Sequence, residues 1–343
     1  INKSSEHFNT KLYTGNATNS TSITGVGFQP DLLWIKDRTN VNNHSLQDAV
    51  RGAGYNLQTN TTNAQGLATE TISSFDTDGW TMNNGGGVNG SGAAFAAWNW
   101  KANGAGSANT DGSISSTVSA NTTSGFSIVS YTGNGTGNST IGHGLGTTPK
   151  FIIVKNLTTA QAWGTKSDSF VSASDPNVLY LNATSAQADD TNVWGTSATF
   201  NNNTFTVGDW NGSNQSGSNF IAYCWSEVQG YSKFGSYTGN GNADGTFVYT
   251  GFKPAFVMFK NTTGNNWGII DNKRDSYNGA LHRLSPNTSG ADNTGAGVVV
   301  DLLSNGFKCR NADGLENGAA KIIYMAFAEA PLVGTNGVTA KAR

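Results

Sequence analysis

Short apolar runs separated by turn residues occur along the whole of this 343-residue chain. Three of them, residues 32–35, 151–154 and 256–259, consist entirely of apolar side chains. Short runs bounded by Gly, Pro and Asn are typical of β-strands. Because the apolar character is continuous and not alternating, it indicates strands that are covered on both faces. The pattern predicts an all-β protein.

The same motifs recur three times in the same order. Each copy has a Tyr-Thr-Gly-Asn tetrapeptide, then a Pro before the apolar run, then a Lys six positions after that Pro, and finally an apolar closing segment. The Tyr residues are Tyr13, Tyr131 and Tyr237, the Pro residues Pro30, Pro149 and Pro254, and the Lys residues Lys36, Lys155 and Lys260. Agreement at four ordered positions indicates tandem duplication. We predict three tandem β-sandwich-like, jelly-roll-like repeats.

The expected boundaries follow from these motifs. The first repeat covers residues 1–103, the second 126–228 and the third 229–343. Residues 104–125 are rich in Gly, Ser, Thr and Asn and are expected to form a linker that carries the first strand of the second repeat. The Tyr-Thr-Gly-Asn motif is interpreted as a hairpin turn, because Gly and Asn tolerate positive φ. Each recurring Lys is expected at a strand end, bonded to carbonyls or to a carboxylate.

Composition supports this fold class and excludes several functions. The chain has 44 Gly and 42 Asn, and only 12% of its residues are charged, which disfavours long amphipathic helices. Disorder is also disfavoured, because aromatic residues make up 10% of the chain. The net charge of −2 predicts no nucleic-acid partner. The longest apolar stretch, residues 322–328, is too short for membrane insertion. Cys224 and Cys309 alone form neither a disulfide framework nor a zinc site.

Few side chains suggest chemistry. His44, Asp48 and Arg51 form the most enzyme-like trio, and we interpret them as a structural cluster of hydrogen bonds and ion pairs. Trp194 and Trp210 lie in segments rich in Asn, Gly and Ser, which makes them candidates for exposed contacts with a receptor glycan. The other recurring aromatic residues are expected in the core. We predict no catalytic residue, no metal site and no cofactor.

Several stretches resemble a known domain. Residues 125–133, 142–146 and 231–241 are similar to a domain of unknown function in structural and tail-fibre-like proteins of marine tailed bacteriophages. The resemblance implies a virion component. Our leading expectation is a non-enzymatic structural protein, most simply a tail fibre or appendage involved in host-surface attachment. One alternative is a capsid decoration or head-fibre protein. Another is a carbohydrate-binding module or a polysaccharide-degrading tailspike.

The resemblance also implies partners and location. Other virion proteins and a host-surface glycan are the expected partners, and a homo-oligomer is expected, with a trimer favoured. Localisation would be the virion, after assembly in the host cytoplasm. Because the chain starts at Ile1, we expect that it can be part of a longer protein. The family has no catalytic residues that could be carried over.

Overall fold

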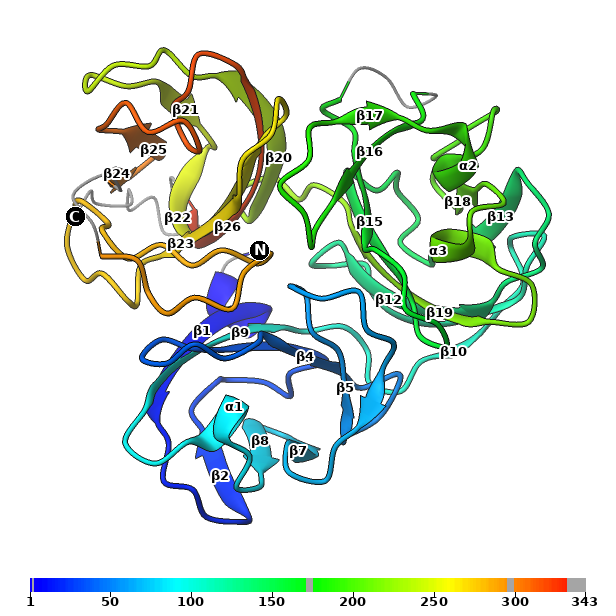
Figure 1. Ribbon diagram of the computed structural model, residues 1–343, viewed down its shortest axis with the longest axis horizontal. Coiled ribbons are helices and arrows are strands. Elements are labelled where there is room, and N and C mark those ends of the chain that lie inside the picture. The colour runs from blue at the N-terminus through cyan, green and yellow to red at the C-terminus, as the bar shows by residue number, and fades with distance from the viewer. Residues whose placement is uncertain (2, 171–174, 295–298, 332–343) are drawn as a thin grey trace.

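The chain forms three β-rich lobes around a common centre, as Figure 1 shows. This computed structural model describes residues 1, 3–170, 175–294 and 299–331. Its α-helices are single turns of four residues, α1 (Gly86–Asn89), α2 (Thr191–Trp194) and α3 (Asn211–Asn214), and a short 3-10 turn, η1, spans Ser4–Glu6. All paired strands are antiparallel, so the all-β prediction is confirmed.

Each lobe is one continuous part of the chain. Lobe 1 contains β1 (Phe8–Thr14), β2 (Thr21–Thr24), β3 (Leu32–Asp37), β4 (Ser45–Asp48), β5 (Tyr55–Asn56), β6 (Gly66–Leu67), β7 (Ile72–Asp76), β8 (Gly79–Met82) and β9 (Ala94–Trp100). Lobe 2 contains β10 (Ser107–Asn109), β11 (Ser116–Asn121), β12 (Phe126–Thr132), β13 (Ser139–Gly142), β14 (Phe151–Asn156), β15 (Gly164–Ser167), β16 (Asn177–Tyr180), β17 (Ala188–Asp189), β18 (Thr204–Val207) and β19 (Asn219–Trp225). Lobe 3 contains β20 (Ser232–Thr238), β21 (Phe247–Tyr249), β22 (Phe252–Asn261), β23 (Trp267–Asp271), β24 (Val300–Leu303), β25 (Gly306–Cys309) and β26 (Lys321–Pro331).

The same strand order occurs in each lobe. Lobe 1 has a sheet β1-β9-β3-β4, lobe 3 has β20-β26-β22-β23, and lobe 2 has β12-β19-β14-β15 within a longer eight-stranded sheet. A smaller second sheet faces each of these: β2-β8-β7 in lobe 1, β13-β18 in lobe 2 and β21-β25-β24 in lobe 3. The closing strand of each lobe, β9, β19 or β26, is therefore central in its sheet.

Strand registers allow residues of the three lobes to be matched. Trp34 lies opposite Trp98, Ile153 opposite Tyr223, and Met258 opposite Met325. Two residues earlier in β3, β14 and β22, the partner on the other neighbouring strand can be matched as well. Leu32 lies opposite Asp48, Phe151 opposite Ser167, and Phe256 opposite Asp271. We call Trp98, Tyr223 and Met325 corresponding residues, and likewise Asp48, Ser167 and Asp271.

The apolar runs of the larger sheets are buried on both faces. In β3, every residue is buried. Leu33 and Ile35 share a core inside lobe 1 with Trp80 of the second sheet. Leu32 and Trp34, on the opposite face, belong to a second core shared by all three lobes. This alternation explains why the runs are continuous in apolar character, and it confirms that the strands are covered on both faces.

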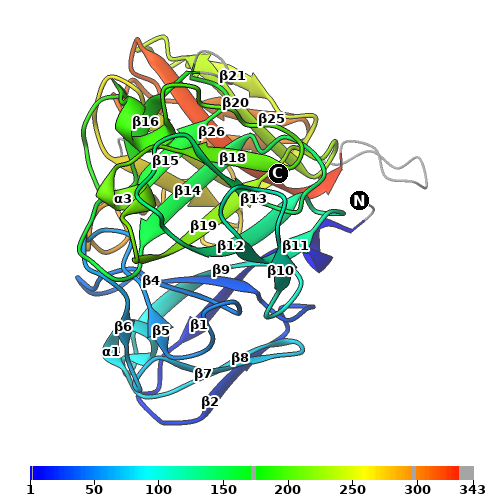
Figure 2. The ribbon, with the colours of Figure 1, turned by 90° about the vertical axis from the view of Figure 1, so that its right-hand side faces the viewer.

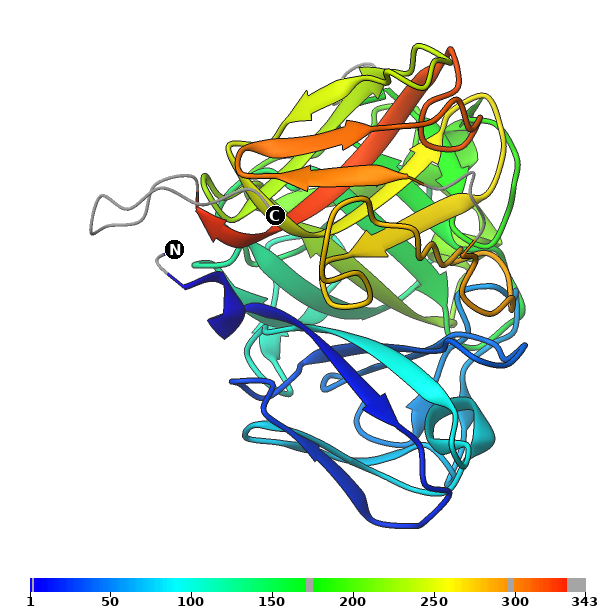
Figure 3. The same ribbon diagram turned by 90° about the vertical axis from the view of Figure 1, so that its left-hand side faces the viewer.

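The shared core holds the lobes together as one body. Aromatic side chains from the three closing strands meet there: the Trp100 ring centroid lies 6.2 Å from that of Trp225 and 5.6 Å from that of Phe327. Phe8 of β1 stacks on Phe327 at 5.1 Å. The side views in Figures 2 and 3 show lobe 1 against lobes 2 and 3. Separation of the lobes would expose the large aromatic surfaces of this core to water, which is unfavourable.

One local expectation was wrong. The Tyr-Thr-Gly-Asn motif does not form a hairpin, because the strands before and after it, such as β12 and β13, lie in different sheets. Its Gly is needed for close backbone approach: a Cβ at Gly133 would lie 2.4 Å from the Gln215 carbonyl oxygen. Within residues 104–125, the expected strand is β11, which pairs along the edge of β12, and β10 pairs with β11 in turn.

Candidate functional site

Many of the recurring side chains lie between lobes. The Trp163 Nε1 of lobe 2 donates to the Thr61 carbonyl oxygen of lobe 1 at 3.1 Å. The Trp267 Nε1 of lobe 3 donates to the Tyr180 carbonyl oxygen of lobe 2 at 3.0 Å. His44 stands at the corresponding position of lobe 1, one residue before β4. Its Nε2 lies 3.0 Å from the Ser285 carbonyl oxygen of lobe 3. The three contacts run from lobe 2 to 1, from 3 to 2 and from 1 to 3, which closes a ring.

His44 is held as a neutral imidazole. Its Nδ1 accepts a hydrogen bond of 2.9 Å from the Trp34 Nε1, so Nε2 must carry the proton that it donates to Ser285. Burial, with a further contribution from the Lys36 charge, lowers its pKa to about 3. Its ring nitrogens bond to Trp34 and Ser285, so the trio read from the sequence does not assemble around it. Asp48 instead pairs with Arg51 at 2.5 Å.

The three recurring lysines are buried beside this ring of contacts. The Lys155 Nζ donates to the carbonyl oxygens of Gln161 and Thr62, and that of Lys260 donates to those of Asn265 and Ala183. Thr62 and Ala183 belong to the preceding lobe. Lys36 donates to the Asp37 carbonyl oxygen at 2.7 Å. Burial lowers the pKa of all three ammonium groups to about 8.

A second set of contacts involves buried ion pairs. The Tyr223 hydroxyl donates to Asp48 Oδ2 at 2.8 Å, and the Trp98 Nε1 donates to Asp271 Oδ2 at 3.0 Å. Each carboxylate also binds an Arg three residues further on, Arg51 or Arg274. At the third junction the corresponding residues are Met325 and Ser167, and Phe170 stands in place of the Arg. The polar cluster is therefore replaced as a whole by a less polar one.

An Asn in each lobe holds the Tyr-Thr-Gly-Asn segment, and the sequence analysis missed it. Its Oδ1 accepts from the backbone N–H of the motif Asn, at 2.9 Å for Asn89 and Asn214 and at 3.1 Å for Asn317. The motif Tyr also reaches this region, with a 2.6 Å bond from its hydroxyl to a backbone carbonyl in all three lobes. The signal that could have found these Asn residues is their recurrence shortly before each closing strand.

The expected exposure of Trp194 was wrong. Trp194 ends helix α2, is fully buried, and packs edge-on against Phe200 at 5.8 Å between ring centroids. Asp190 caps the start of this helix, because its Oδ1 accepts a hydrogen bond from the Asn192 N–H. The helix then turns Trp194 inward. Trp210 is partly buried and lies 5.7 Å from the ring of Tyr180. Neither Trp forms an open platform for a sugar ring.

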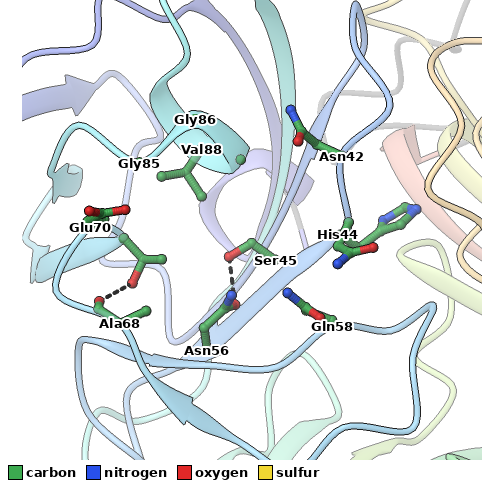
Figure 4. A pocket seen from close by; sticks show the side chains of 13 residues that line it. Asn42, His44, Ser45, Asn56, Gln58, Ala68, Glu70, Gly85, Gly86 and Val88 are labelled. Atoms are coloured by element: carbon green, nitrogen blue, oxygen red, sulfur yellow. Dashed lines mark hydrogen bonds between the residues drawn. The ribbon is translucent and has the colours of Figure 1, made fainter.

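A polar cleft on lobe 1 is the candidate binding site. It holds about 240 Å³ and is shown in Figure 4. Its walls come from the segment before β4, from β5 and the residues after it, from the segment before β7, and from α1. The polar residues that line it are Asn42, Asn43, His44, Ser45, Asn56, Gln58, Glu70 and Thr71. The Ser45 Oγ donates to Asn56 Oδ1 at 2.8 Å, which orients the Asn56 amide. In Figure 4 the His44 ring points away from the cleft.

The cleft offers amides, hydroxyls and one carboxylate. Glu70 is exposed, and its side chain is the cleft's negative charge. On the α1 side, Gly86 and Gly87 leave open space, since a Cβ on either would contact nothing within 4 Å. Such a lining can donate and accept several neutral hydrogen bonds at once, which suits a polyhydroxyl ligand.

A single family model matches residues 3–331 and so includes all three lobes. The chain belongs to the family of the domain of unknown function DUF7483. No curated protein and no solved structure matches the chain. Because one DUF7483 model runs across the three lobes, the family unit agrees in extent with the body that shares the central core.

Two further observations describe this DUF7483 domain. Within residues 1–331, apart from the short segments that the structure does not describe, no group of three or more His, Cys, Asp or Glu side chains could hold a metal ion. No helix in the same residues is long and apolar enough to cross a membrane. Cys224 and Cys309 are buried free thiols, and burial raises the pKa of both.

Proposed function

We propose that this DUF7483 domain is a non-enzymatic structural protein of a tailed-phage virion, part of a tail fibre or similar appendage that contacts the host surface. The resemblance of residues 125–133 and 231–241 to tail-fibre-like phage proteins supports the virion assignment. The observation that carries the structural role is the ring of contacts between lobes. Its buried lysines, aromatic N–H groups and ion pairs are used to join lobes into one rigid body.

We further propose that the lobes are three tandem copies of one sandwich-like unit. Matching strand orders, matching registers and the recurring Asn and Tyr contacts support duplication. A sandwich with a larger and a smaller sheet fits the described strands better than a jelly roll, which packs two four-stranded sheets. Heterologous contacts that close after three units form a ring, the arrangement that a homotrimer would otherwise build from separate chains.

Host contact is proposed at the polar cleft on lobe 1. A rigid β body that carries polar loops is a suitable scaffold for recognition. Amides and hydroxyls without a large aromatic surface favour weak binding of a neutral glycan. Avidity from several copies in one particle would then raise the overall affinity. We also propose that the chain forms a homotrimer, which would supply three copies of the cleft.

The assignment to a tail appendage is tested by locating the chain in the virion. Cryo-electron microscopy of the particle, or gold-labelled antibody against the domain, should place it on the tail. Density at capsid lattice positions would overturn this and support the capsid decoration alternative. Light scattering of the purified domain measures whether it is trimeric.

Glycan binding has its own test. Binding of the purified domain to host-surface polysaccharide should fall several-fold in Gly87→Leu, which places a side chain in the open part of the cleft. A matched control is Gly137→Leu, because Gly137 also has open space around it and no positive φ, but lies in lobe 2. Equal binding by wild type and Gly87→Leu would remove the cleft from the proposal without affecting the virion assignment.

A further inference from the structure

The first strand of each lobe has one edge that faces away from its closing strand, and the three edges differ. In lobe 2, β11 pairs along this edge of β12 from Phe126 to Tyr131. In lobe 3, the Phe234 N–H on the edge of β20 points to Glu227 Oε2 at 3.4 Å, and the Phe234 ring stacks on Phe151 of lobe 2. The edge is thus covered by strand β11 in lobe 2, and in lobe 3 one of its N–H groups is hydrogen-bonded to the Glu227 carboxylate.

The corresponding edge of β1 is open. The His7 carbonyl accepts from the Lys101 N–H, and the Gly15 N–H donates to the Ala93 carbonyl, so odd-numbered residues bond toward β9. The backbone groups of Phe8, Thr10 and Leu12 therefore point to the free edge. Among the described residues, none hydrogen-bonds to the backbone of Thr10 or Leu12 there, and β9 is the sole strand partner of β1.

A groove of about 330 Å³ runs beside this open edge. It is lined by Asn9, Thr10, Lys11, Leu12, Gly25 and Lys273. Thr10 is 6% exposed, and its Oγ1 has no hydrogen-bond partner within the described part of the chain. A buried hydroxyl and unpaired backbone groups beside an open groove are the features of a site that is filled by another chain.

Comparison with lobe 2 indicates what would fill it. Lys11 corresponds to Val129, because Tyr13 and Tyr131 hold the same register against Phe95 and Phe220. Val129 lies opposite Val118 of the covering strand β11. On the other side of the groove, Lys273 corresponds to Val50, each lying directly before the Arg of its ion pair. The covered edge of β12 thus has valines around it at the two positions where the open edge of β1 has lysines.

We propose that the open edge of β1 binds an extended segment of a partner protein as an added antiparallel strand, with an acidic side chain opposite Lys11. The backbone hydrogen bonds would repeat those between β11 and β12, and the carboxylate would replace the Val118 to Val129 contact by an ion pair. Small side chains at the remaining positions, like the Ser, Thr and Ala of β11, would fit the narrow groove.

The probe is a peptide of residues 114–122 that carries Val118→Glu. Calorimetric titration into the whole domain should show saturable one-to-one binding, and the unsubstituted peptide should bind several-fold more weakly. The same peptide with N-methyl groups on its ladder-forming amides should not bind. In the Lys11→Glu domain the preference between the two peptides should reverse.

Several results would overturn the proposal. Two of them use the wild-type domain: the Glu peptide does not bind, or the N-methylated peptide binds equally well. Unchanged binding by Thr10→Pro, with its fold checked by circular dichroism, would also count against the edge. Self-association of the domain that is lost in Thr10→Pro would assign the edge to a second copy instead of a partner protein.

Discussion

Tyr223 of lobe 2 donates a 2.8 Å hydrogen bond to Asp48 of lobe 1, and both side chains are fully buried. Asp48 also pairs with Arg51 at 2.5 Å, so the phenol completes the coordination of a buried charge pair. Trp98 and Asp271 repeat the contact between lobes 1 and 3. At the remaining junction donor and acceptor are both replaced, by Met325 and Ser167, so no buried carboxylate is left without its donor.

Removing the phenolic hydroxyl of Tyr223 should destabilise the domain. Because Asp48 would lose a buried hydrogen bond to a charged group, we expect Tyr223→Phe to lower the free energy of unfolding by about 1.5–3 kcal/mol. Tyr231→Phe is the matched control, since Tyr231 is equally buried but its hydroxyl has no hydrogen-bond partner in the described chain. Guanidinium unfolding of both variants checks this. An equal loss in the two would mean that the Asp48 contact contributes nothing specific.

The three polar residues of this junction should be exchangeable as a set. Asp48→Ser, Arg51→Phe and Tyr223→Met together give the residues found between lobes 2 and 3. We expect the triple variant to lose less stability than the sum of the three single variants, because no buried charge remains unpaired. The same unfolding measurements, compared as a mutant cycle, give the coupling. Strict additivity would contradict the correspondence between junctions.

Acid should weaken the junction between lobes 1 and 3 through His44. Its pKa is lowered from 6.5 to about 3 by burial, so the folded state excludes the proton that the unfolded chain takes up. The stability due to neutral His44 is fully present above pH 6.5 and is lost as the pH falls from there toward 3. Unfolding free energies of wild type and His44→Gln should therefore converge as the pH falls from 7 to 4.

His7 and His143 titrate in the same direction, because burial lowers the pKa of each. They are present in both proteins, so the difference between wild type and His44→Gln isolates His44. A difference that stays constant over this pH range would contradict the assignment of a neutral, buried imidazole.

Loss of a single Asn should release the Tyr-Thr-Gly-Asn segment. The Asn214 Nδ2 donates to the carbonyls of Thr136 and Gly208, and its Oδ1 accepts from the Asn134 N–H. Asn214→Ala leaves buried backbone groups unpaired, and we expect a loss of about 2–4 kcal/mol, more than one ordinary hydrogen bond. Asn202→Ala is the control, because Asn202 is exposed and should change stability by less than about 0.5 kcal/mol. Thermal unfolding distinguishes the two.

Local patterns in the chain were enough to predict part of this structure. The short apolar runs required strands, and their continuous character required cover on both faces, which Leu32 and Leu33 receive from two different cores. The recurring order of Tyr, Pro and Lys is visible along the chain, and one copy of it lies in each lobe. These features depend on neighbouring residues and on burial, so they can be read along the chain.

Other features depend on which segments meet in space, and only the tertiary structure decided them. Trp194 lies among polar residues in the sequence but is buried because α2 turns it inward. His44 is a different residue type from Trp163 and Trp267, yet it occupies the corresponding position in lobe 1 and closes the ring of contacts. The polar cleft and the open edge of β1 also arise from segments that are distant in sequence. The amino-acid sequence by itself determined the all-β class and the order of the recurring motifs. The packing of three aromatic faces into one core decided how the lobes meet, because that burial depends on long-range contacts that no local pattern records.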